Sequence, residues 1–281
     1  MVGDALLDVA VAAGKLAEGG DVRGNVRVQP GGTGANAAAW AADSVARTRL
    51  HARVGDDAAG RLIADALSEH GVECAFAVDP KTPTGAMLIV QEEGERSMVA
   101  DRGASAHLSP DDLPETLDAR AVLVSGYLLF DPGSEEAGIA ALARASADHV
   151  AVDAASWPLL AEYGVERFFE RTTEATLLFA NEREAEVLVG ETGLQAAMRL
   201  AERYAVACVK LGSRGAAVAG GKSAVLETGV EGSEVVDATG AGDAFDGTFL
   251  AALARGESLR AALRLACSAG ARAAASESPW P

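Results

Sequence analysis

Short apolar runs alternate with alanine-rich stretches of helical periodicity along most of the chain. The apolar runs predict parallel strands over Arg49–Val54, Ala121–Val124, His149–Asp153, Leu177–Ala180 and Ala207–Leu211. The stretches between them predict helices over Ala35–Ala46, Ala58–Glu69, Glu135–Ala147, Glu182–Val189 and Gln195–Tyr204. This alternation favours an α/β fold, a mostly parallel central sheet between two helical layers. The runs are almost wholly apolar, as expected of strands buried on both faces.

The pattern changes in two places and ends in two helices. Val9–Gln29 and Thr84–Asp101 resemble short antiparallel strands, with a hairpin turn at Glu93–Gly94–Glu95. We expect them to form a small β-flap, or lid, from about residues 9–30 and 84–101, on a single domain of residues 1–281. The last helices are predicted over Asp243–Ala254 and Leu259–Ala274, with Gly256 as a C-terminal cap between them.

Composition narrows the class of protein. The 281 residues are 49% hydrophobic and 23% charged, with a formal net charge of −17. Such a charge repels nucleic acid and anionic membrane, so neither is an expected partner. The three cysteines have no CxxC spacing, no apolar run approaches the length of a membrane helix, and Asp4 and Asp8 stand where a leader would be basic. We expect a reduced, cytoplasmic enzyme.

The most informative stretch is Asp237-Ala-Thr-Gly-Ala-Gly-Asp243, which leads into an apolar helix. Free backbone N–H groups at a helix N-terminus attract anions, and Gly240 and Gly242 let a phosphate come close. Asp243 in the first turn is placed to accept a proton from an attacking hydroxyl. Taken alone, the pattern is more typical of a surface helix capped by Asp after a tight turn.

This stretch resembles the second signature of the ribokinase (PfkB) carbohydrate kinase family, Asp-Thr-x-Gly-Ala-Gly-Asp, with Ala238 in place of the usual Thr. The resemblance implies a ribokinase-like fold. It also implies that Asp243 is the catalytic base and that the amides of Gly240, Ala241 and Gly242 form the anion hole.

Further family motifs follow in order from Gly3 to about Ala269. Gly3–Asp8 resembles the opening motif of the family, and Gly31–Asn36 resembles its first signature. Asn181–Glu184 resembles the Asn-x-x-Glu motif, and Val209–Gly215 resembles the strand and turn beside the nucleotide. The resemblance implies substrate binding by Asp8, Gly32 and Asn36, ATP binding by Asn181, Gly212 and Gly215, and Mg²⁺ near Glu184, held through water. The family often needs a monovalent cation such as K⁺ near the Asp237 turn, which this sequence does not decide.

Several of these residues have a structural alternative. Asn181 and Glu184 have the spacing of a capping box. Asp8 alone would be taken for a turn residue, and Lys210 is predicted to be a strand-end lysine outside the catalytic set. Relatives often have Asp-x-Asn where this chain has Asp153-Ala-Ala155, so no role is carried over there.

Two other stretches resemble nucleotide-binding motifs but are better explained otherwise. Gly32-x-Gly34-x-x-Ala37, with Asp56 about 20 residues on, fits a dinucleotide fingerprint. It follows Pro30 and a polar segment rather than an apolar strand, and it leaves Asn181–Glu184 and Asp237–Asp243 unexplained. The stretch Gly215–Ser223 resembles a phosphate-binding loop with one residue too many, and a hairpin turn explains it better.

The sequence therefore predicts an ATP-dependent kinase that phosphorylates a hydroxyl of a sugar or related polyol. A nucleoside kinase is the main alternative, although no aromatic residue for base stacking lies between Val9 and Gln29. A non-catalytic sugar-binding regulator is disfavoured by the intact Asp243 and Glu184. Arg102 is predicted to be a solvated flap charge rather than a contact for an anionic sugar. The sequence leaves open a homodimer through the lid, the particular substrate and the hydroxyl that reacts.

Overall fold

A mostly parallel sheet forms the centre of the protein. The computed structural model describes residues 1–15, 18–92, 95–221, 223–227, 229 and 235–281. Val2 bridges two groups of strands in parallel, through His51 on one side and Val124 on the other, so the order is β4-β3-Val2-β8-β10-β11-β12-β13-β14. The pairs are parallel as far as β12, and β13 and β14 are antiparallel. These strands are β3 (Thr48–Gly55), β4 (Val72–Asp79), β8 (Ala121–Ser125), β10 (His149–Asp153), β11 (Leu177–Asn181), β12 (Val206–Lys210), β13 (Ala216–Gly220) and β14 (Ser223–Glu227).

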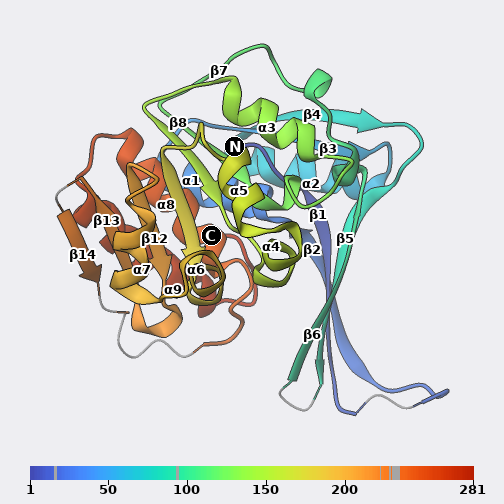
Figure 1. Ribbon diagram of the computed structural model, residues 1–281. Helices are drawn as coiled ribbons and strands as arrows, with labels where there is room; N and C mark the ends of the chain where they lie inside the picture. The colour runs from blue at the N-terminus through green and yellow to red at the C-terminus, as the bar shows by residue number, and fades with distance from the viewer. Residues whose placement is uncertain (16–17, 93–94, 222, 228, 230–234) are drawn as a thin grey trace.

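Helices pack on both faces of this sheet (Figure 1). Successive side chains of a strand point to opposite faces, so Leu178 lies in one apolar cluster and its neighbours Leu177 and Phe179 in the other. This double burial explains the uniformly apolar strand sequences and confirms the predicted fold class. The helices are α1 (Thr33–Asp43), α2 (Ala58–Glu69), α3 (Glu135–Ala143), α4 (Trp157–Tyr163), α5 (Val165–Arg171), α6 (Glu182–Val189), α7 (Gly193–Leu200), α8 (Ala241–Ala254) and α9 (Leu259–Ala274).

Some local predictions were wrong at element ends. The helix expected to reach Ala147 stops at Ala143, because Ala145–Ser146 (β9) pairs in parallel with Leu117–Asp118 (β7). The last helical pair begins at Ala241 rather than Asp243. Single 3₁₀ turns complete the described secondary structure, at Ala104–His107, Pro110–Asp112, Gly126–Leu128 and Gly212–Arg214.

A second, four-stranded sheet projects from the body of the molecule (Figure 1). Its order is β2 (Gly24–Gly31), β1 (Leu6–Ala13), β5 (Thr84–Glu92) and β6 (Glu95–Gly103). The outer pairs are antiparallel as predicted, but β1 and β5 are parallel, because both leave the body in the same direction. The turn predicted at Glu93–Gly94–Glu95 lies in part outside the described residues, and Glu92 pairs with Glu95 on either side of it.

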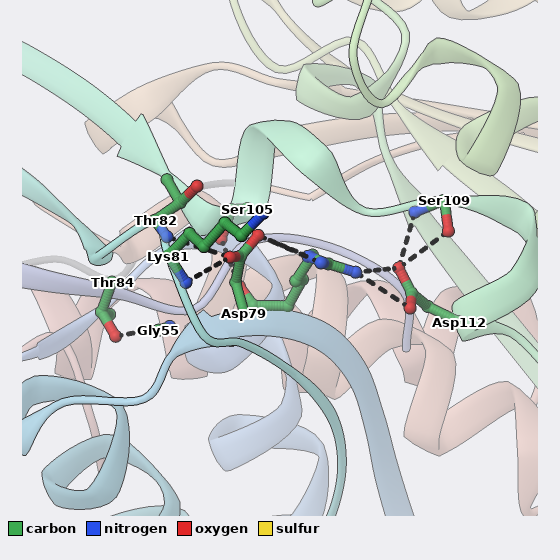
Figure 2. A network of polar contacts seen from close by, with 9 residues as sticks. Gly55, Asp79, Lys81, Thr82, Thr84, Ser105, Ser109 and Asp112 are labelled. Carbon is green, nitrogen blue, oxygen red and sulfur yellow. Dashed lines mark hydrogen bonds and ion pairs between the residues drawn. The ribbon is translucent and has the colours of Figure 1, made fainter.

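Polar contacts hold the base of this small sheet (Figure 2). The Asp79 carboxylate accepts hydrogen bonds from the backbone N–H groups of Lys81 and Thr82, each at 2.9 Å, and these bonds hold the pKa of Asp79 well below its usual value. The Arg53 guanidinium joins Asp79 to Asp112. Together these bonds fix the turn from β4 into β5.

Arg102, at the end of β6, ties the small sheet to the main body. Its guanidinium donates to both oxygens of Asp4, at 2.8 and 3.0 Å, and to the Ser134 hydroxyl, and it pairs with Asp131. The side chain is only 13% exposed. The prediction of a solvated flap charge was therefore wrong.

The stretch Gly215–Ser223 is part of a hairpin, as the sequence indicated. Strands β13 and β14 pair antiparallel, with Gly220 opposite Ser223. Lys222 lies outside the described residues. The glycines of this stretch thus serve a strand and its turn rather than the N-terminus of a helix.

Candidate active site

The first glycine motif forms the junction between β2 and α1. Gly32 caps the helix with a φ of 91°, which favours glycine. A Cβ on Gly31 would lie 2.2 Å from the Asp8 carboxyl carbon, and one on Gly32 would lie 2.6 Å from the Asp4 carbonyl oxygen. The two glycines therefore let this turn close over the buried Asp8 carboxylate, which β1 presents from the small sheet. Because β2 and β3, the strands before and after α1, lie in different sheets, the βαβ context of a dinucleotide fold is absent.

The second glycine motif forms the start of α8. Asp237 accepts hydrogen bonds from the Thr239 backbone N–H, at 2.9 Å, and from its hydroxyl, which closes the turn without a hydroxyl at position 238. Gly240 caps the helix in the left-handed conformation, φ 74°. The Ala241 N–H donates to the Ala238 carbonyl at 3.3 Å. First-turn amides have no partner within their own helix, so this end of α8 presents N–H groups to an anion.

Asp243 lies in that first turn, and its carboxylate Oδ2 accepts a hydrogen bond from Asn36 Nδ2 at 2.8 Å. Burial raises the pKa of Asp243 from 3.8 to about 7. The Asn36 hydrogen bond and the Lys210 charge oppose this rise, and the charges of Asp153 and Asp8 add to it. A carboxyl group with a pKa near neutrality is suited to general-base chemistry.

Asn36 is itself buried and has a second partner. Its Oδ1 accepts a hydrogen bond from the indole Nε1 of Trp280 at 2.8 Å. The structure thus brings Asn36 and Asp243 together, as the motifs implied. The Trp280 contact had no signal in the sequence, because 244 positions separate the two residues.

The carboxyl ends of three neighbouring parallel strands meet beside this helix terminus, at Asp153 of β10, Asn181 of β11 and Lys210 of β12. The Lys210 ammonium pairs with Asp246 at 2.9 Å and with Asp153 at 3.3 Å. Burial lowers the pKa of Lys210, but the charges of Asp153, Asp246 and Glu184 outweigh that effect and raise it well above its usual value. Lys210 therefore stays protonated.

Lys210 also lies directly against the glycine turn. A Cβ on Gly242 would come within 3.4 Å of the Lys210 ammonium nitrogen. Lys210 is thus a fixed positive charge at the amide-rich end of α8, which sequence reasoning left out of the site. Its position at the end of an apolar strand, on the edge where parallel sheets bind ligands, was the available signal.

Asn181 and Glu184 form a complete capping box at the start of α6. Asn181 Oδ1 accepts from the Glu184 N–H at 3.0 Å, and Glu184 Oε2 accepts from the Asn181 N–H at 2.7 Å. Burial, with the charge of Asp153, raises the pKa of Glu184 to about 7. The structural alternative for this pair is therefore realised in full.

The described residues contain no group of three or more His, Cys, Asp or Glu side chains arranged to hold a metal. Magnesium is commonly bound by one or two carboxylates together with substrate phosphates, so Glu184 and Asp153 suit that mode. Gly212 and Gly215 shape the turn after β12, with φ of 60° and 97°. This turn continues the edge that carries Lys210.

The fold just described is that of the ribokinase-like class of α/β proteins. The model of the pfkB family of carbohydrate kinases matches residues 1–279, and the chain belongs to this family. The protein is accordingly a phosphotransferase that acts on hydroxyl groups. Along the part of the chain that the structure describes, no helix combines the length and the apolar character needed to cross a bilayer.

Known proteins of two substrate classes resemble the chain. Ribokinase of Bacillus subtilis (strain 168) is 30% identical, over 95% of this chain and 89% of its own. Adenosine kinase of Sinorhizobium meliloti superposes with a TM-score of 0.89 at 25% identity, over 100% of this chain and 94% of its own. Ribokinase of Arabidopsis thaliana, solved with ribose and ATP, superposes with a TM-score of 0.78 at 26% identity, over 100% and 94%.

Proposed function

We propose that the protein transfers the γ-phosphoryl group of ATP to a hydroxyl of a sugar or related polyol, with Asp243 as the catalytic base. The observation that carries the proposal is the partly buried Asp243 carboxylate, held by Asn36 in the first turn of α8, with a pKa of about 7. A base with that pKa is half ionised at neutral pH and takes up the hydroxyl proton as the oxygen attacks.

The sugar would lie between the small sheet and α8. Asp8 on β1 is close enough for its charge to raise the pKa of Asp243. Asp8 and the turn at Gly32 would hold hydroxyls that do not react, while Asn36 and Asp243 orient the one that does. Holding a hydroxyl in line with the phosphorus removes much of the entropic part of the barrier.

The phosphates would lie along the carboxyl edge of the large sheet. Amides of Gly240, Ala241 and Gly242, with the Lys210 ammonium 3.4 Å from the Gly242 Cβ position, would stabilise the charge on the transferring group. Asn181, Gly212 and Gly215 would contact ATP. Bound Mg²⁺, held through water near Glu184, would neutralise charge on the phosphate oxygens. The Arabidopsis ribokinase complex with ribose and ATP supports this pair of ligands.

A sugar fits the small sheet better than a nucleoside does. Its strands Leu6–Ala13, Gly24–Gly31, Thr84–Glu92 and Glu95–Gly103 contain no Phe, Tyr or Trp on which a base could stack. Nucleoside phosphorylation is the second candidate because of the close superposition with adenosine kinase. Thermal-shift measurements with sugars and nucleosides, each with a non-hydrolysable ATP analogue, separate the two, since a true ligand raises the melting temperature.

A homodimer through the small sheet belongs to the same proposal. Strand register places Val28, Val9, Leu88 and Val99 in one row across all four strands, on the face opposite Asp8. Val28 and Val99 are more than half exposed. A second copy would cover this apolar row, and light scattering of the protein and of Val28→Lys would detect the pairing.

The decisive experiment replaces Asp243 by Asn, which keeps the shape but cannot accept the proton. With Mg-ATP and the sugar found by the screen, kcat for ADP formation should fall about 10²–10⁴-fold. ATP affinity should change little, since backbone amides form the anion site. If Asp243 only stabilises the first turn of α8, which Gly240 caps, the Asn variant would remain nearly fully active, because Asn keeps the shape of the side chain. That result would overturn the proposal.

A further inference from the structure

We propose that Trp280 is a positioning residue, whose indole N–H fixes the orientation of the Asn36 amide and through it that of Asp243. The inference rests on the proposed function of Asp243 as the base. Two hydrogen bonds of 2.8 Å connect the three side chains, from Trp280 Nε1 to Asn36 Oδ1 and from Asn36 Nδ2 to Asp243 Oδ2.

The chemistry of the indole determines the direction of this chain of bonds. An indole nitrogen can only donate, whereas an amide side chain has one accepting and one donating end. The Asn36 oxygen must therefore face Trp280, which turns its NH₂ group toward Asp243. The opposite amide orientation would set two donors against each other at Trp280 and two acceptors at Asp243, and a buried unsatisfied group costs about 1–3 kcal/mol.

The segment that follows α9 holds Trp280 firmly in place. The Trp280 ring is buried and meets the His70 ring edge-on, with 5.2 Å between centroids. The preceding Pro279 carbonyl accepts a hydrogen bond from Trp40 Nε1 at 2.8 Å. Pro279 also lies against Gly240, where a Cβ would come within 2.8 Å of it. The segment thus touches the glycine turn as well as Asn36.

The consequence for Asp243 is both geometric and electrostatic. Asn36 occupies Oδ2, so Oδ1 is the oxygen that would receive the proton from the substrate hydroxyl. The same hydrogen bond favours the ionised carboxylate and lowers its pKa. The charged groups around Asp243 are Asp8 on β1, Asp153 on β10, Lys210 on β12 and Asp246 one turn along α8. A change at Trp280 reaches Asp243 through Asn36, and the contact of Pro279 with Gly240 is a second route. Trp40→Phe controls for that second route, because Trp40 holds the Pro279 carbonyl.

The test compares Trp280→Phe with Trp40→Phe. Both variants lose one buried indole N–H that holds the same segment, but only the Trp280 indole donates a hydrogen bond to Asn36. In Trp280→Phe the acid limb of the kcat profile should move upward by about 0.5–1 pH unit, as loss of roughly 1 kcal/mol of hydrogen bonding implies. Turnover should fall several-fold at pH 7 and recover by pH 9, with little change in KM. Trp40→Phe should lower the melting temperature without moving the acid limb.

A second readout needs no substrate. The ¹³C signal of the Asp243 carboxyl, assigned by its loss in Asp243→Asn, should titrate at higher pH in Trp280→Phe and unchanged in Trp40→Phe. In the unsubstituted protein the Trp280 indole N–H resonance should follow the Asp243 midpoint, and this response should vanish in Asp243→Asn. The indole measurement remains decisive even if Trp280→Phe fails to fold.

The outcomes separate the two proposals. A shifted carboxyl midpoint in a protein that forms no ADP would support the Trp280 proposal and refute the proposed function. Normal ADP formation with an indole resonance insensitive to Asp243, and an unshifted carboxyl midpoint in Trp280→Phe, would overturn the role of Trp280.

Discussion

Val45 holds a backbone conformation that β-branched residues rarely adopt. Its φ is 61°, and it lies just after α1, where the left-handed conformation usually selects glycine. The side chain is 88% exposed, so little packing offsets the strain. Val45→Gly should therefore raise the free energy of unfolding by about 1 kcal/mol in urea titrations. Val45→Ala keeps a Cβ and should recover only part of that gain, and a loss of stability in the glycine variant would contradict the argument.

At the scale of residues, the sequence predicted motifs formed by neighbouring positions but not contacts between distant ones. The glycine turns are local, so Gly32, Gly240 and Asp243 were found from their immediate neighbours. Lys210 meets Asp246, 36 positions away, and Trp280 meets Asn36, 244 positions away. Only the fold determines which distant side chains converge, and two donors near the proposed base, which contact its neighbours rather than Asp243 itself, were therefore missed. Arg102 was misjudged for the same reason, since its partner Asp4 is 98 positions away.

At the scale of elements, the Arg102–Asp4 pair should decide how firmly the small sheet joins the body. Both side chains are largely buried, and removing one member of a buried pair leaves the other charge uncompensated. Arg102→Met should lower the free energy of unfolding by about 3–5 kcal/mol, and adding Asp4→Asn should restore much of the loss. Arg49→Met breaks the exposed pair with Glu73 and should cost less than about 1 kcal/mol. If Arg102→Met lowered the free energy of unfolding no more than Arg49→Met does, the Arg102–Asp4 pair would not be what joins the small sheet to the body.

The start of α6 allows capping to be separated from metal binding. Glutamine serves in a capping box as glutamate does, so Glu184→Gln should fold with nearly unchanged stability near neutral pH. It removes the charge that a hard cation favours, so half-maximal activity should require several-fold more Mg²⁺. Glu182→Gln, on the same turn but paired with Arg214 at the surface, should leave the Mg²⁺ titration unchanged. An unchanged titration for Glu184→Gln with a lower melting temperature would assign Glu184 to capping alone.

Element types were predicted better than their boundaries and pairings. Apolar runs and helical periodicity identified the core strands because both sheet faces are buried, as at Leu177–Phe179. The parallel pairing of β1 with β5 could not be read from the sequence, because hydrophobic alternation is the same in parallel and antiparallel strands. The early end of α3 depends on the pairing of Ala145–Ser146 with Leu117–Asp118, again a distant contact.

For the whole molecule, the net charge of −17 makes the concentration of buried carboxylates the notable electrostatic feature. Asp153, Glu184 and Asp246 are buried, and together with Asp243 they lie around Lys210, whose side chain is 14% exposed. Burial raises the pKa of Glu184 and Asp243 to about 7 and that of Asp246 well above its usual value. Ionisation of these carboxylates at alkaline pH therefore lowers the free energy of unfolding, and bound cations would offset this effect.

The raised pKa of Asp243 predicts how the free energy of unfolding depends on pH. The pKa of Asp243 is about 7 in the folded protein and 3.8 ordinarily, so its contribution to stability is complete below pH 3.8 and is lost as pH rises through 7. Between pH 5 and pH 8 the protein should lose roughly 2–3 kcal/mol relative to Asp243→Asn, because about two units of the shift are given up in that window. The Met1 amine and His51, whose pKa values are lowered, act with the opposite sign but equally in both proteins, so they cancel in the difference. Urea unfolding of both proteins at several pH values measures this difference, with Glu182→Gln as a partly exposed control. Stability curves that stay parallel from pH 5 to pH 8 would show that ionisation of Asp243 does not lower the free energy of unfolding.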